Sequence, residues 1–85
     1  MVNYTIQAGL AIRKIKRPRA KFTMDIVEHP DYIELRVYED EIMELNETQR
    51  FEIMDYLITC QKMVETFGVK CWPGGAAGKP PRRRR

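Results

Sequence analysis

The sequence predicts an α+β fold: an antiparallel β-meander of three strands, followed by one amphipathic C-terminal α-helix and a disordered basic tail. Two periodicities support this prediction. On both sides of a short turn near residue 30, apolar residues alternate with polar ones, which is the period of a half-buried strand. Further along the chain the apolar spacing changes to three and four residues, which is the period of an amphipathic helix. A helix and a sheet that are each apolar on one side bury those sides against each other.

The helix is predicted over residues 46–67. Its main apolar positions follow one another at spacings of four, three, four and three residues: Ile53, Leu57, Cys60, Val64 and Phe67. Asn46 suits the N-cap because its side-chain oxygen accepts a hydrogen bond from a first-turn amide, and Gln49 can reach back as in a capping box. Gly68 suits the C-terminal end because glycine readily adopts the left-handed conformation that stops a helix.

Residues 21–29 and 32–40 predict two antiparallel strands joined by a tight turn. Three apolar residues alternate with polar ones on each strand, and together they form one buried face: Phe22, Met24, Ile26, Ile33, Leu35 and Val37. Between the strands, Pro30 presets the backbone for a turn and Asp31 tolerates the next position. The hairpin therefore offers the helix an apolar face.

The N-terminal segment, residues 4–12, fits a strand or a helix. Alternate residues along it are apolar, as in a strand: Tyr4, Ile6, Ala8, Leu10 and Ile12. Gly9 weakens a helix by about 1 kcal/mol relative to alanine, whereas in a strand it marks a bulge. We therefore favour a strand, which completes the meander.

The remaining segments are assigned by composition. Pro18 disfavours a helix through residues 14–21 and predicts an exposed loop. Residues 70–72 either return to the core or form a short strand. Residues 73–85 are rich in Gly, Pro and Arg and have little to bury, which predicts disorder. We expect one domain, residues 1–72, followed by this tail.

Charge is divided unevenly along the chain. Residues 1–21 carry six basic and no acidic groups, a net charge of +6, and residues 70–85 carry another +6. Residues 22–69 carry three basic against twelve acidic groups, a net charge of −9. No stretch reaches the roughly 18 apolar residues of a membrane span. The basic residues follow the apolar N-terminal ones, the reverse of a signal peptide, so we expect an intracellular protein without membrane contact.

The chain offers little for catalysis. Its one histidine, His29, precedes the predicted turn, while Cys60 and Cys71 are expected to be buried structural thiols. The spacings of 31 and 11 residues between these three do not form a zinc signature. The acidic run at residues 39–44 lacks the residue order of a calcium loop. We therefore expect a non-enzymatic protein with no catalytic residues, no metal site and no cofactor.

Two basic clusters are candidates for nucleic-acid binding or nuclear localisation, because closely spaced cations neutralise phosphates or enter an acidic groove. Tyr32 and Tyr38 are expected to be ordinary sheet residues and not RNA-stacking platforms, because acidic residues lie between them. The acidic body should repel phosphate, so RNA or DNA would be held by the basic clusters alone. These candidates are Arg13, Lys14, Lys16, Arg17, Arg19, Lys21, Arg82, Arg83, Arg84 and Arg85.

Phe51, Met54 and Ile58 widen the apolar stripe of the helix beyond what one small sheet is expected to cover. They either fill the core or form a protein interface, including a homodimer through the helix. We expect a small adaptor or regulatory module that binds a protein partner, with basic segments for nuclear targeting or nucleic-acid tethering. These segments favour a nuclear over a cytoplasmic location. The alternative is a direct nucleic-acid-binding regulatory or viral accessory protein that uses the basic loop and the arginine tail.

Overall fold

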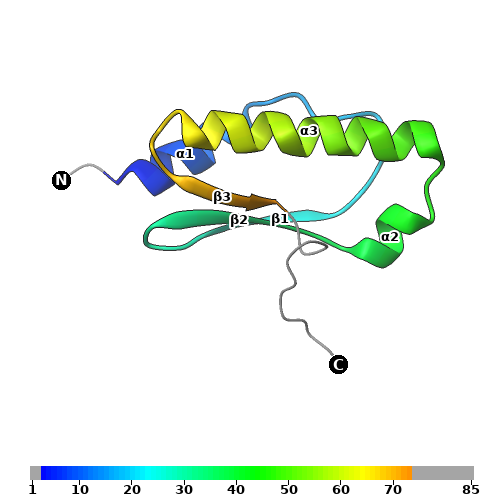
Figure 1. Ribbon diagram of the computed structural model, residues 1–85, viewed down its shortest axis with the longest axis horizontal. Helices are drawn as coiled ribbons and strands as arrows, with labels where there is room; N and C mark the ends of the chain where they lie inside the picture. The colour runs from blue at the N-terminus through cyan, green and yellow to red at the C-terminus, as the bar shows by residue number, and fades with distance from the viewer. Residues whose placement is uncertain (1–2, 74–85) are drawn as a thin grey trace.

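The computed structural model describes residues 3–73, and these form three helices and three strands. In chain order the elements are α1 (Tyr4–Arg13), β1 (Met24–Glu28), β2 (Tyr32–Val37), α2 (Glu39–Met43), α3 (Glu47–Glu65) and β3 (Lys70–Pro73). The strand order is β1-β2-β3, and α1 and α3 lie on the same side of this sheet (Figure 1). The α+β class is confirmed. Pro73 belongs to β3, and the rest of the predicted tail lies outside the described residues.

The predicted hairpin is confirmed, but its strands are shorter than the predicted residues 21–29 and 32–40: β1 covers residues 24–28, β2 ends at Val37, and residues 39–40 begin α2. β1 and β2 pair antiparallel, with Met24 opposite Val37 and Glu28 opposite Ile33. The backbone N–H of His29 donates to the carbonyl of Tyr32 at 2.9 Å and closes the turn. The inward side chains of β2 are buried in the core, so the alternating pattern did identify the buried face: Ile33, Leu35 and Val37.

The third strand differs from the prediction. It is β3, at the end of the domain, and it pairs parallel to β2 with Cys71 opposite Ile33. Parallel neighbours require a long crossover connection, and α2 and α3 supply it between β2 and β3. The sheet is therefore mixed, and the prediction of a purely antiparallel meander is wrong.

Residues 4–13 form helix α1, so the predicted strand over residues 4–12 is wrong. Ala8 and Ile12, four residues apart, are buried, whereas Leu10 stays exposed although the strand pattern placed it on the same face. Asn3 caps the helix, because its side-chain oxygen accepts hydrogen bonds from the N–H groups of residues 5 and 6 at 3.0 and 3.2 Å. The carboxylate of Glu28 occupies the space that a Cβ on Gly9 would fill. Glycine at this position thus leaves room beside α1 for the carboxylate of Glu28, which pairs with Arg13.

Helix α3 has the predicted ends. The N–H of Gln49 donates to Asn46 Oδ1 at 2.8 Å, and the N–H of Asn46 donates to Gln49 Oε1 at 3.1 Å, which completes the capping box. Gly68, with a φ of +75°, follows the last turn in the left-handed conformation. The side of the helix that faces the sheet and α1 carries its buried residues: Ile53, Tyr56, Cys60 and Val64.

Asn46→Ala should lower the free energy of unfolding by about 1 kcal/mol, because the first turn of α3 loses its side-chain acceptor. Urea denaturation followed by circular dichroism measures this loss. Asn46→Asp is the matched control, since it keeps the acceptor and adds a charge that the helix dipole favours. Equal losses of unfolding free energy in the two variants would show that the side-chain acceptor at residue 46 contributes nothing to stability.

The short helix α2 was not predicted. Its residue Ile42, together with Leu45 after it, packs partly buried against the core, and its acidic residues point to the surface.

Within residues 3–73 no helix is long and apolar enough to cross a membrane.

Candidate functional surfaces

The predicted interface residues lie on the solvent side of α3. Phe51, Met54 and Ile58 are 58%, 56% and 44% exposed. Successive helical residues turn by about 100°, so these three lie roughly opposite the buried side of α3. They do not fill the core, so the first of the two interpretations of these residues in the sequence analysis is excluded. We call Phe51, Met54 and Ile58 the outer stripe.

The outer stripe is the apolar centre of a longer seam along α3. Polar residues continue its spacing of four and three in both directions, namely Glu47 before it and Gln61 and Glu65 after it. A repeat of this kind stays on one side of a helix, as the a and d positions of a coiled coil do. The seam is therefore apolar in the middle and acidic at both ends.

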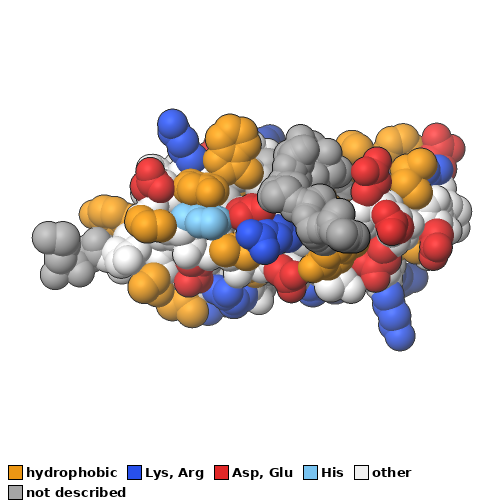
Figure 2. All heavy atoms as spheres, turned by 90° about the horizontal axis from the view of Figure 1, so that it is seen from below, with side chains coloured by type: hydrophobic (Ala, Val, Ile, Leu, Met, Phe, Trp, Pro, Cys, Tyr) orange, Lys and Arg blue, Asp and Glu red, His pale blue; other side chains and the backbone are white. Residues whose placement is uncertain are grey.

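The surface around the outer stripe is acidic. Residues 39–65 contain eight acidic and two basic groups, a net charge of −6. Met43 of α2 is exposed and lies beside Arg50, whose Nη1 is 3.8 Å from its sulfur, so apolar surface extends toward α2. Figure 2 shows acidic side chains gathered around apolar ones at the α2 end of the molecule. The exposed acids of this region are Glu39, Asp40, Glu44, Glu47, Glu52, Asp55 and Glu65.

The predicted basic loop connects α1 to β1 through residues 14–23, which we call the basic loop. Arg17 fastens it to the core: Nη2 donates to the carbonyl of Phe22 at 2.8 Å. The guanidinium also lies 4.6 Å from the ring centroid of Phe22 and 5.8 Å from that of Tyr56. The two rings pack edge to face at 6.0 Å. Arg17 is therefore part of the structure of the loop.

The structure divides the predicted basic candidates into three groups. Arg13 forms an ion pair with Glu28 at 2.8 Å, and Arg17 is held by aromatic rings and a carbonyl. Arg82 to Arg85 lie outside the described residues. The remaining four are exposed and form no ion pair within residues 3–73: Lys14, Lys16, Arg19 and Lys21.

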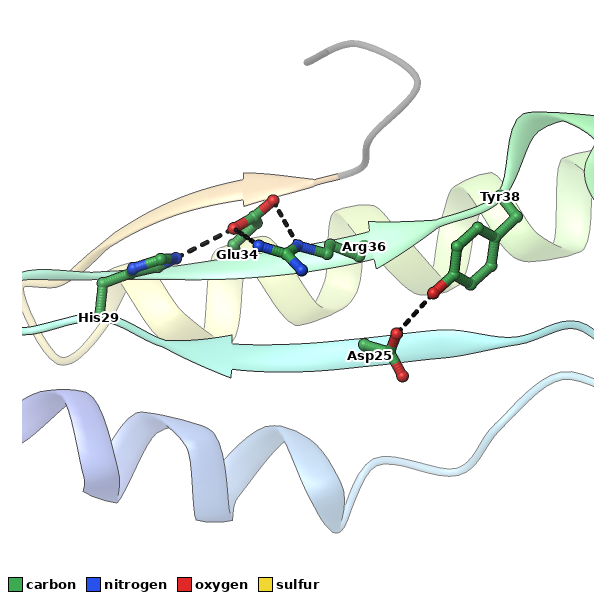
Figure 3. A network of polar contacts seen from close by, with 5 residues as sticks. All are labelled: Asp25, His29, Glu34, Arg36 and Tyr38. Atoms are coloured by element: carbon green, nitrogen blue, oxygen red, sulfur yellow. Dashed lines mark hydrogen bonds and ion pairs between the residues drawn. The ribbon is translucent and has the colours of Figure 1, made fainter. Parts of the chain in front are cut away.

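The outer face of the sheet, which is the face turned away from α1 and α3, carries a polar network (Figure 3). Glu34 accepts two hydrogen bonds from Arg36, at 2.9 and 3.2 Å, and lies 3.0 Å from His29 Nε2. The His29 ring stacks on Tyr32 with centroids 4.1 Å apart. The hydroxyl of Tyr38 donates to Asp25 at 2.7 Å. Both tyrosines have contacts inside the protein, and a carboxylate lies between them. Tyr32 is a sheet residue as expected, whereas Tyr38 follows β2 as the N-cap residue of α2.

This network gives stability a pH dependence. The hydrogen bonds from Arg36 hold the pKa of Glu34 below its ordinary 4.5, against the opposing effect of burial, and His29 lowers it further. Because the folded pKa is lower, ionised Glu34 stabilises the fold above pH 4.5, and this contribution is lost as the pH falls through the folded pKa. Glu34→Gln should therefore flatten the acid side of the stability profile.

Urea denaturation at a series of pH values measures that slope. Glu52→Gln, which removes an exposed carboxylate of α3, is the control and should keep the wild-type slope. Identical slopes in all three proteins would contradict the proposed contribution of Glu34.

Both cysteines are buried, as expected for structural thiols. Burial raises the pKa of Cys71 to about 12 and also raises the pKa of Cys60, so both remain protonated thiols at neutral pH. Within the part of the chain that the structure describes, no group of three or more His, Cys, Asp or Glu residues could hold a metal ion.

Comparisons with protein-family models, curated proteins and solved structures found no match to this chain.

Proposed function

We propose that the protein is a non-enzymatic interaction module whose outer stripe binds a basic amphipathic helix of a partner protein. One observation carries the proposal: three large apolar side chains of α3 are 44–58% exposed, while the opposite side of the same helix is buried in the core. Such a row at helical spacing is what coiled coils and helix-in-groove complexes bury.

Charge supports the choice of a basic partner. The seam ends in Glu47 and Glu65, and the flanking surface of α2 and α3 is acidic. Lysines or arginines beside the apolar row of a partner helix would meet these carboxylates, which speeds association and fixes the register. Met43 and Met54 add flexible, polarisable side chains that adapt to the shape of the partner.

The same charges disfavour a homodimer through α3. In an antiparallel pair Glu47 of one copy would approach Glu65 of the other, and in a parallel pair each glutamate would approach itself. Like charges at such positions oppose pairing. We therefore propose a different protein as the partner and treat self-association as an outcome of the test.

The basic segments have a separate part in this proposal. They would direct the module to the nucleus or hold it near a nucleic acid, so that the folded body brings its partner there. The exposed cations of the basic loop support this part.

The test uses a labelled peptide of about two heptads with leucines at a and d and lysines elsewhere. Fluorescence anisotropy should show binding to the intact chain. Ile58→Glu should weaken it at least about tenfold, because a charge enters the centre of the apolar row. Thr59→Glu is the matched control: it adds the same charge to the next residue, outside the stripe, and should keep most of the affinity.

Three outcomes would overturn the proposal. Equal losses in the Ile58→Glu and Thr59→Glu proteins would show that general charge, and not the stripe, governs binding. Equal binding of a peptide with glutamates in place of the lysines would remove the argument for a basic partner. Sedimentation that shows a dimer abolished by Ile58→Glu would assign the stripe to a second copy.

A further inference from the structure

We propose that the basic loop is a second, preformed binding site, which contacts the phosphate backbone of a nucleic acid through Lys14, Lys16, Arg19 and Lys21. Arg17 acts as a positioning residue that holds these cations in place. This site is separate from the outer stripe and does not depend on the proposed protein partner.

The first support is the attachment of the loop. Arg17 bonds the Phe22 carbonyl and lies over two aromatic rings, while Ala20 and Phe22 are buried in the core. At the end of the loop, the N–H and hydroxyl of Thr23 donate to Glu41 of α2 at 2.6 and 3.1 Å. The backbone that carries the four exposed cations is thus fastened at several points.

This attachment distinguishes the two kinds of ligand that the sequence allows for the basic loop, which are a nucleic acid and a nuclear import receptor. A receptor that takes a basic segment as an extended peptide in its groove requires that segment to leave the body. Leaving would expose Phe22 and break both interactions of Arg17. A phosphate backbone can bind the cations where they lie, so the structure favours nucleic acid over a nuclear import receptor for this cluster.

The second support is the local charge. Residues 14–23 contain no acidic residue, and the carboxylate of Glu28 is paired with Arg13. Most exposed acids of the body lie on other elements, on α2 and along α3 from Glu47 to Glu65. Glu41 is the acid bonded to the loop, and it lies at Thr23, beyond the last of the four exposed cations. The loop thus presents a run of positive charge on an otherwise acidic body.

The number of cations sets the expected salt dependence. Each neutralised phosphate contributes a slope of about −0.9 to log K against log salt on duplex DNA, so four contacts give about −3.6. That slope corresponds to an affinity loss on the order of 100-fold between about 50 and about 200 mM salt.

The experiment measures this slope with the intact chain in which Lys79 and Arg82 to Arg85 are replaced by alanine, so that residues 74–85 carry no cationic side chain. The probes are short duplex DNA, duplex RNA and single-stranded RNA. Lys14→Ala with Lys16→Ala should make the duplex slope less steep by about 1.8, the share of two phosphates. Lys62→Ala with Lys70→Ala is the matched control: it removes the same charge from exposed positions on α3 and β3 and should leave the slope nearly unchanged.

The positioning role of Arg17 has its own readout. Arg17→Lys keeps the charge but loses the planar guanidinium that bonds a carbonyl and lies over two rings. We expect it to weaken binding and reduce the salt slope at constant net charge, because the loop no longer holds its cations together. A lysine variant with wild-type slope and affinity would show that Arg17 does not position the site.

The outcomes separate this proposal from its competitors. Equal effects of the two double variants, or no binding to any of the three probes, would overturn it. Binding to an import receptor without affinity for the probes would assign the loop to localisation instead. The probe that binds most tightly identifies the kind of nucleic acid that supplies the phosphates. None of these results depends on the leucine–lysine peptide, so this site and the outer stripe fail independently.

Discussion

Ile53→Ala should lower the free energy of unfolding by about 2–5 kcal/mol, whereas Ile58→Ala should change it by less than about 0.5 kcal/mol. Both isoleucines lie in α3 and the substitution is the same, so helix propensity cancels in the comparison. Ile53 is 2% exposed in the core, while Ile58 is 44% exposed in the outer stripe. Folded domains of this size have only a few kcal/mol of stability, so the Ile53 variant should be partly unfolded.

Urea denaturation followed by circular dichroism compares the two proteins. Similar losses would mean that the outer stripe is packed in solution, against a second copy or another part of the chain. Sedimentation of the wild-type protein over a range of concentrations separates those two cases.

Ile12→Ala should also cost about 2–5 kcal/mol, and Leu10→Ala less than about 0.5 kcal/mol. The two residues are two apart, so a strand would place both on one face and give them similar burial. In helix α1 they point in different directions: Ile12 is 0% exposed and Leu10 is 55% exposed. The comparison therefore tests residues 4–13, which the sequence pattern assigned to a strand and the structure shows as a helix.

Thermal or urea denaturation measures both variants, and far-ultraviolet circular dichroism confirms that Leu10→Ala stays folded. A large loss for Leu10→Ala, comparable to that for Ile12→Ala, would contradict the packing of α1.

Local signals explain which elements the sequence predicted. The ends of α3 depend on Asn46, Gln49 and Gly68, whose roles are fulfilled by residues close in the chain. The hairpin depends on alternation and a turn, which are also local. Such features need no knowledge of the rest of the fold.

The errors came from features that depend on distant residues. In residues 4–12 the exposed Ile6 and Leu10 complete an alternating apolar pattern that resembles a strand. The one local sign of a helix was Asn3, which suits an N-cap. The space that Gly9 leaves for Glu28 is visible only once α1 packs on β1. The direction of β3 follows from the crossover through α3, which its four residues do not encode.

The candidate sites show the same division. The width of the apolar stripe singled out Phe51, Met54 and Ile58 but left open whether they fill the core. Their exposure follows from how α3 packs on the sheet and α1. The sequence grouped Arg17 with the other cations of its cluster. Its attachment to Tyr56 joins the loop to α3, a contact between residues far apart in the chain that no local pattern reveals.

A single NMR titration decides whether α3 presents one face to the core and another to a partner. The basic leucine–lysine peptide is added to the intact chain, and amide and methyl chemical shifts are followed. We predict the largest changes at Phe51, Met54 and Ile58, extending to Met43. Changes should be small at Trp72, which is 58% exposed and pairs in register with Glu34 on the outer face of the sheet. Changes centred on Trp72, or no changes at all, would contradict a docking role for the outer stripe.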